Sequence, residues 1–232
     1  MKNIYYLFLI SIIICSCNKN SKDKNRGRIG ISKENYIDKL IPREDDTVYT
    51  KKWISIDYGN GRIEDAEIYI SNHNDTILNQ YKLYYKNQID IKESEYYNLE
   101  IWNTKKPHFY SGRITMHTVY ENLKLNKANR RTVEFAYREQ TKDSTSLKYI
   151  KSTTSNTIDF EFQNYFGNRL TGKLYQLVYR DTIIKGEKML NMRQIKILVD
   201  NFSETVNLFI GTTSDIKEKK FNLKKSNLKL VN

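Results

Sequence analysis

The stretch Thr157-Ile158-Asp159-Phe160-Glu161-Phe162-Gln163 (TIDFEFQ) alternates polar and apolar side chains with a period of two. Successive side chains of a β-strand point to opposite faces of a sheet, so this stretch predicts a strand with one face in a core and one in water. Similar alternation recurs at 54–58, 68–71, 132–138 and 194–200. Residues 174–179 are apolar on both faces, which predicts a more central strand.

Turn-forming residues separate these stretches, and no long helical pattern interrupts them. The turns are expected at 59–61, 72–75, 126–129, 142–144, 167–168, 180–181 and 200–201. One short helix is expected over 32–41, with Ser32 as its N-cap and Pro42 after its end. The sequence therefore predicts an all-β protein, an antiparallel β-sandwich or barrel of roughly ten to twelve strands with one short N-terminal helix.

The basic charge of the chain lies mainly at its two ends. The 232 residues carry a formal net charge of +12. Residues 18–32 hold five basic side chains and one acidic one, and residues 213–232 hold six lysines and two acidic side chains. The body of the chain, 33–212, is nearly balanced, with 27 basic and 24 acidic side chains. A nucleic-acid-binding domain carries a basic patch on its folded surface, so this distribution argues against a nucleic-acid partner.

The first residues have the pattern of an export signal. A basic start, Met1-Lys2-Asn3, precedes the apolar run Ile4–Ile14, which is shorter than the roughly 20 residues of a membrane-spanning helix. The only cysteines of the chain, Cys15 and Cys17, follow this run. Two cysteines cannot complete a metal site of three or four ligands, and their spacing is poor for a disulfide.

Ile14-Cys15-Ser16-Cys17 resembles the lipobox of bacterial lipoproteins, with an aliphatic residue at −3 and a small residue at −1 before the acylated cysteine. The resemblance implies a signal peptide at 1–16 and lipidation of Cys17. It also implies a protein held at the outer membrane by its acyl chains, because Asn18 replaces the aspartate of inner-membrane retention. A basic segment after Cys17 favours a periplasm-facing domain. The alternatives are ordinary secretion and an apolar run that arises by chance.

The remaining chain divides into three parts on this hypothesis. Residues 17–32 form a basic flexible tether, 33–212 a single all-β domain, and 213–232 a basic C-terminal tail. The tether can lie near anionic head groups or be a solvated linker.

Catalytic and metal-binding motifs are not recognisable in the sequence. His73, His108 and His117 lack ligand spacing, and neither a nucleophile elbow nor a phosphate-binding loop is found. We therefore expect no cofactor, no metal and no enzymatic activity. Asp159 and Glu161 share one strand face and have the residue types of a glycoside hydrolase pair, but the solvated face of a strand is the favoured interpretation.

A short motif of Asp, then Ser or Thr, then Thr or an aliphatic residue occurs four times. It resembles the acceptor motif of an O-glycosylation system that modifies exported proteins of some Gram-negative bacteria. The resemblance implies modification of the hydroxyls of Thr47, Thr76, Ser144 and Thr182. Ordinary turn chemistry is an equal alternative, because Asp favours turns and β-branched residues begin strands.

The stretch Trp102–Tyr110 (WNTKKPHFY) gathers aromatic and cationic side chains between two strands. Such loops are typical of partner or sugar recognition. The candidate binding surface comprises Trp102, Lys105, Lys106, His108, Phe109 and Tyr110. The competing interpretation is that Trp102 and Phe109 pack the loop onto the core.

These observations favour a non-catalytic binding module with a protein or glycan partner in the cell envelope. A glycan-directed periplasmic hydrolase and a barrel-type carrier of apolar ligands are the alternatives. A cavity rimmed by carboxylates is expected for the hydrolase, an apolar cavity for the carrier, and a filled core with an exposed aromatic patch for the binding module.

Overall fold

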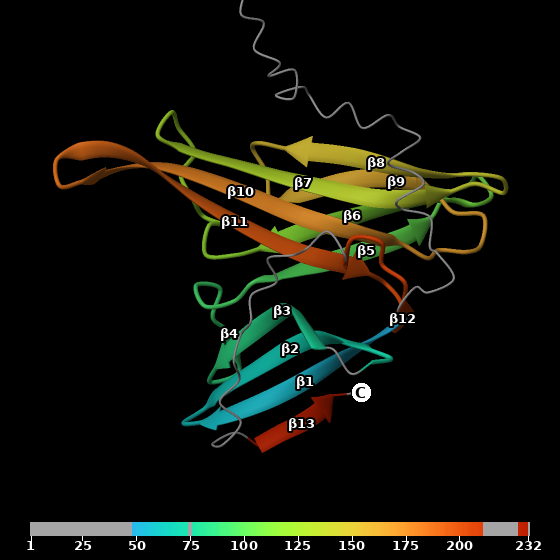
Figure 1. Cartoon of the computed structure of the whole chain (residues 1–232), viewed down its shortest axis with the longest axis horizontal. Coiled ribbons are helices and arrows are strands. Elements are labelled where there is room, and N and C mark those ends of the chain that lie inside the picture. Colours follow the sequence, from blue (N-terminus) through green and yellow to red (C-terminus); the bar gives the residue numbers. More distant parts are fainter. Residues whose placement is uncertain (1–47, 74–75, 211–226, 232) are drawn as a thin grey trace, which may run out of the picture. The chain divides into compact units, whose positions relative to one another are not determined.

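The computed structural model describes residues 48–73, 76–210 and 227–231, and every regular element within them is a β-strand. Thirteen strands form three sheets in which all paired strands are antiparallel (Figure 1). The predicted all-β antiparallel fold is therefore confirmed. The predicted helix over 32–41 lies outside the described residues.

The strands are grouped into sheets as follows. An N-terminal sheet has the order β12-β1-β2-β3-β4, with β13 also paired to β1; its strands are β1 (Tyr49–Gly59), β2 (Arg62–Ser71), β3 (Thr76–Tyr85), β4 (Gln88–Ile89), β12 (Glu204–Thr205) and β13 (Asn227–Val231). A long sheet has the order β11-β10-β7-β8; its strands are β7 (Asn129–Gln140), β8 (Thr145–Ser152), β10 (Thr171–Ile184) and β11 (Glu187–Asp200). A short sheet has the order β5-β6-β9; its strands are β5 (Tyr96–Asn103), β6 (Phe109–His117) and β9 (Thr157–Gln163).

The long and short sheets enclose the main hydrophobic core. Phe160 of β9 lies at its centre, with its ring centroid 4.9 Å from that of Phe135 and 5.3 Å from that of Tyr137, both on β7. Gly112 on β6 faces this ring, and a Cβ there would lie 2.4 Å from Phe160 Cζ. The packing is close enough that β6 needs a residue without a side chain at this position. The burial predicted for TIDFEFQ is confirmed. Its apolar residues Ile158, Phe160 and Phe162 are buried, and Asp159 and Glu161 are exposed.

The N-terminal sheet departs from the predicted pattern on β2. Ile68 lies in a small apolar cluster on one face, as its periodicity predicts. The intervening residues Glu67, Tyr69 and Ser71, which alternation would leave in water, are only 2%, 0% and 4% exposed. β2 is buried on both faces because Asn79 and Tyr69 of this sheet bond to β11 of the long sheet. A polar face can be buried when its groups find partners there.

Two segments extend strands beyond their predicted ends. A turn predicted at 180–181 lies instead within β10, and the chain reverses at Lys185-Gly186, where both residues have positive φ (52° and 84°). Thr182, Ile183 and Ile184 are β-branched, which favours continuation of the strand. Residues 227–231, within the segment predicted as a tail, form β13 against β1. The turn at 59–61 is confirmed, with positive φ at Gly59, Asn60 and Gly61.

Candidate functional site

The predicted binding loop is the turn between β5 and β6. Trp102 lies opposite Ser111 in the register, on the face of the short sheet turned away from the core, and is 45% exposed. Phe109 lies two residues from Ser111 and so shares this outer face as a diagonal neighbour of Trp102. Lys106 Nζ lies 3.6 Å from the centroid of the Phe109 ring, a cation–π contact. The side chain of Trp102 is therefore presented to solvent rather than packed in the core.

The turn is held by its own hydrogen bonds. Thr104 Oγ1 accepts from the Lys106 N–H at 3.2 Å and donates to the Phe109 carbonyl oxygen at 2.9 Å. His108 has a positive φ of 64°, which places its ring against that of Tyr165 at a centroid distance of 4.3 Å. The Asn164 N–H donates to the His108 carbonyl oxygen at 2.9 Å. The turn after β9 is thus fixed beside the turn after β5.

This second turn adds two aromatic residues that sequence reasoning missed. Tyr165 and Phe166 are 38% and 66% exposed. The stretch Asn164-Tyr165-Phe166-Gly167-Asn168 has two adjacent aromatics before a Gly-Asn turn, which was an available signal. We call the resulting surface the aromatic patch, defined by Trp102, Lys106, His108, Phe109, Tyr165 and Phe166.

Two other residues of the predicted surface have different positions. Lys105 is exposed at the tip of the turn. Tyr110 is turned inward, where its ring stacks on the buried Phe162 at 5.2 Å and packs against the main core. The inclusion of Tyr110 in the binding surface was wrong, because its strand position alternates with that of Phe109.

The carboxylates considered for a hydrolase lie on the outer face of the short sheet. Arg113 Nε donates to Asp159 Oδ1 at 2.7 Å, and the two side chains are 50% and 64% exposed. This ion pair holds the pKa of Asp159 below its usual value, first through the hydrogen bond from Arg113. Glu161 is also exposed. The interpretation of Asp159 and Glu161 as a solvated strand face is confirmed.

The four hydroxyls of the recurring Asp-Ser/Thr motif have different environments. Thr47 lies outside the described residues. Thr76 is exposed at the start of β3, and Ser144 is exposed in the turn before β8, where its hydroxyl lies 2.8 Å from Thr141 Oγ1. Thr182 is half-buried inside β10 rather than at a strand entry. Thr76 thus has the accessibility that a glycan requires, and Thr182 has the least of the three described hydroxyls.

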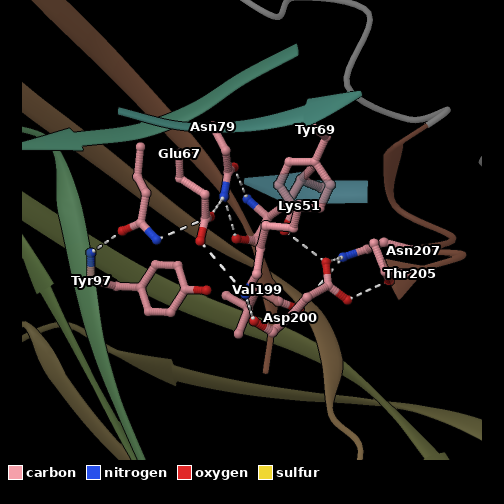
Figure 2. Close-up of polar contacts among 11 residues, drawn as sticks. Lys51, Glu67, Tyr69, Asn79, Tyr97, Val199, Asp200, Thr205 and Asn207 are labelled. Carbon is pink, nitrogen blue, oxygen red and sulfur yellow. Dashed lines mark hydrogen bonds and ion pairs between the residues drawn. The ribbon is translucent and has the colours of Figure 1, made fainter. Parts of the chain in front are cut away.

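A buried polar cluster joins the N-terminal sheet to the long sheet (Figure 2). The cluster is defined by Lys51, Glu67, Tyr69, Asn79, Asp200, Thr205 and Asn207. Glu67 accepts from Asn79 Nδ2 at 2.7 Å and from Gln80 Nε2 at 3.1 Å, while Lys51 Nζ lies 3.6 Å from Glu67 Oε2. Lys51 Nζ also donates to the backbone carbonyl of Asp200 at the end of β11. The lysine therefore bridges the two sheets.

Asp200 accepts three hydrogen bonds within this cluster. The donors are Tyr69 Oη at 2.8 Å, Thr205 Oγ1 at 2.7 Å and Asn207 Nδ2 at 2.7 Å. Burial nonetheless raises the pKa of the Asp200 carboxyl to about 6, against the opposing effect of these donors and of Lys51. Burial and the neighbouring Asp200 carboxylate also raise the pKa of Tyr69. Tyr69 donates to Asp200 and Asn79 donates to the Leu198 carbonyl oxygen, so residues of the N-terminal sheet bond directly to β11 and the cluster fastens the two sheets together.

The raised pKa of Asp200 predicts a stability that falls as pH rises. A carboxyl whose pKa is higher in the folded state holds its proton there, while the unfolded chain, in which the pKa has its ordinary value of 3.8, has lost it. The contribution is present below about pH 4 and is lost by about pH 6, and two pKa units correspond to about 3 kcal/mol. Asp200→Asn should keep the fold, because the Thr205 hydroxyl can rotate to accept from the new amide. Urea titrations of both proteins from pH 4 to 7 test this: the variant should gain stability relative to the unaltered chain as pH rises, and parallel curves would contradict the assignment.

The described residues offer no group of three or more His, Cys, Asp or Glu side chains arranged to hold a metal ion. Within the same residues, no helix is long and apolar enough to cross a membrane. Cys17 lies outside them.

The fold and its surfaces define an all-β protein whose long and short sheets pack over an aromatic core and whose surface carries an exposed aromatic patch. No family model and no solved structure matches the chain. It is similar to an uncharacterized protein of Methanocaldococcus jannaschii, with 24% identity over 202 residues that cover 75% of this chain and 67% of that protein.

Proposed function

We propose that the protein is a lipoprotein of the cell envelope, anchored to the outer membrane through acylated Cys17, whose β-domain binds a protein or glycan partner without catalysis. The observation that carries the binding part is the aromatic patch. Of its five rings, those of His108, Tyr165 and Phe166 belong to two turns that hydrogen bonds and ring stacking hold together, and those of Trp102 and Phe109 lie at the strand ends beside the first turn. A pre-formed surface loses little conformational entropy when a partner binds, and aromatic side chains are the usual anchors of such surfaces.

The core supports this proposal over the two alternatives. Phe135, Tyr137 and Phe160 stack on one another in the sandwich, which is the filled core expected of a binding module. An open groove of about 390 Å³ lies on the N-terminal sheet, lined by Ser55, Ile63, Asp65, Tyr84 and Asn87. A groove this open does not enclose an apolar cargo as a carrier's cavity would. The carboxylates considered for hydrolysis are exposed on the outer face of the short sheet.

The anchoring part of the proposal is tested by metabolic labelling with a fatty-acid analogue. The label is expected on the unaltered chain and on Cys15→Ala, and its loss is expected on Cys17→Ala. Several acyl chains give stable attachment because each buried methylene contributes about 0.8 kcal/mol. Label on the Cys17→Ala chain would refute the assignment.

Trp102→Ala is expected to weaken partner binding while it leaves the fold intact. Trp102 lies on the outer face of the short sheet and keeps 45% of its surface in water, so the free energy of unfolding should change by about 1 kcal/mol, well below the roughly 3–5 kcal/mol of a core tryptophan. Truncation of an aromatic anchor at an interface costs about 2 kcal/mol, or about 30-fold in affinity. A photo-crosslinker placed at Lys105, the exposed tip of the turn, identifies the partner. The affinity of the unaltered and Trp102→Ala chains for that partner is then measured.

Tyr149→Ala supplies the matched control, because Tyr149 is 61% exposed on β8, outside the aromatic patch. It should bind the crosslinked partner as the unaltered chain does. Equal affinity of the Trp102→Ala chain would refute the patch as the binding surface, and a large loss of stability would assign Trp102 to the core.

A further inference from the structure

β10 and β11 continue beyond their neighbour as a two-stranded ribbon (Figure 1). The last register pair between β10 and β7 is Arg180 with Asn129, whereas β10 and β11 remain paired as far as Ile184 with Glu187. Ile183, Leu190 and Met192 lie on one face of this ribbon and are 70%, 55% and 58% exposed. Large apolar side chains in water on a strand pair are a feature of association surfaces.

The backbone groups on the outer edge of β11 have different surroundings at the two ends of the strand. At Leu198 the side chain of Asn79 takes the place of a neighbouring strand, accepting from the Leu198 N–H at 2.7 Å and donating to its carbonyl oxygen at 2.8 Å. At Asp200 the carbonyl oxygen accepts from Lys51. Between Glu187 and Arg193, β11 pairs with no strand but β10 in the described part of the chain. Unpaired edges of this kind are templates for a further strand.

The direction of the backbone groups on this free edge follows from Leu198. Its N–H and C=O point away from β10, because Asn79 binds both. The register between β10 and β11 is continuous, and in an antiparallel pair every second residue has its groups on the same side. The N–H and C=O of Lys188, Leu190 and Met192 therefore also point outward.

We propose that this edge pairs with the same edge of a second copy of the chain, antiparallel about a two-fold axis at Leu190. In this register Leu190 lies opposite Leu190 of the second copy, and Lys188 lies opposite Met192, so that all the outward-pointing groups meet. Two identical edges related by a two-fold axis form an isologous interface, the commonest arrangement of protein dimers. The exposed Leu190 and Met192 of both copies then lie side by side.

Charge selects this register over its neighbours. Pairing about Leu190 places Glu187 of each copy opposite Arg193 of the other, on one face. Arg193 also lies 3.2 Å from Glu95 of its own chain but keeps 48% of its side chain exposed, so its guanidinium can take a second carboxylate. Pairing about Met189 would set Lys185 opposite Arg193, and pairing about Lys188 would set two lysines against each other. Like charges directly opposite are unfavourable.

Cysteine crosslinking tests both the contact and its register. The full chain is prepared with Cys15→Ser and Cys17→Ser, in a non-ionic detergent, so that an introduced cysteine is the sole thiol. Leu190→Cys should form a disulfide-linked dimer under mild oxidation, because the two Cα atoms face each other at a distance that a disulfide spans. Met189→Cys, also exposed, should not, since its counterpart lies two residues away along the edge.

A charge exchange separates this contact from non-specific association. The dimer measured by sedimentation should be lost in Glu187→Arg and in Arg193→Glu and recovered in the double variant. A dimer linked through Met189→Cys, no dimer through either cysteine, or a dimer indifferent to the charge exchange would each overturn the proposal. The contact is independent of the aromatic patch, so Trp102→Ala should leave the dimer unchanged.

Discussion

Phe160→Ala is expected to reduce the free energy of unfolding by about 3–5 kcal/mol, measured by urea titration. Phe160 is 4% exposed, and its ring packs against those of Phe135, Tyr137 and Phe162. Removing it takes away the burial of a large apolar side chain and leaves a cavity between β6 and β7. Phe166→Ala is the matched control, because Phe166 is 66% exposed and its loss should change stability little.

Gly112 provides an independent check on the position of this ring. Gly112→Ala alone should cost about 1–3 kcal/mol, since the new Cβ would lie 2.4 Å from Phe160 Cζ. In the Phe160→Ala background the same change should cost almost nothing, because the methyl group would enter the cavity. Additive losses in the double variant would show that the two residues do not face each other.

The local alternation of side chains was sufficient to predict most strands and the fold class. TIDFEFQ identified β9 and its buried face, and the apolar run at 174–179 correctly indicated a strand with neighbours on both sides, because β10 lies between β11 and β7. Periodicity reports on the faces of a strand. It does not report which sheet a strand joins, and the division into three sheets could not be predicted.

The misjudged face of β2 has the same origin. Glu67 and Tyr69 have the pattern of a solvated face, yet both are buried where this sheet meets β11. Tyr69 donates to Asp200, 131 residues away, and Glu67 is held by Asn79 and Lys51, which themselves bond to β11. No local pattern encodes such a contact. The sequence predicted only part of the aromatic patch. The stretch Trp102–Phe109 is rich in aromatic and cationic residues, whereas Tyr165 joins the patch only because its ring stacks on that of His108.

Lys51→Met is expected to destabilise the protein by about 3 kcal/mol at neutral pH. Lys51 is the cation that bridges Glu67 of β2 and the Asp200 carbonyl of β11, and Glu67 is 2% exposed. Its removal leaves a carboxylate buried with two neutral donors and no counter-charge, and breaking a buried ion pair from one side costs about 3–5 kcal/mol. We expect the lower end of this range because the Lys51 side chain is 15% exposed and the pair is therefore partly solvated.

The double variant Lys51→Met with Glu67→Gln distinguishes this charge effect from lost packing. A glutamine keeps an acceptor for Asn79 and Gln80 and carries no charge, so most of the loss should be recovered. Lys151→Met, an exposed lysine on β8, controls for the effect of the substitution type. If the double variant loses at least the sum of the single losses in urea titration, the ion pair does not fasten the two sheets, and the stability at this junction comes from the hydrogen bonds of Asn79 and Tyr69 alone.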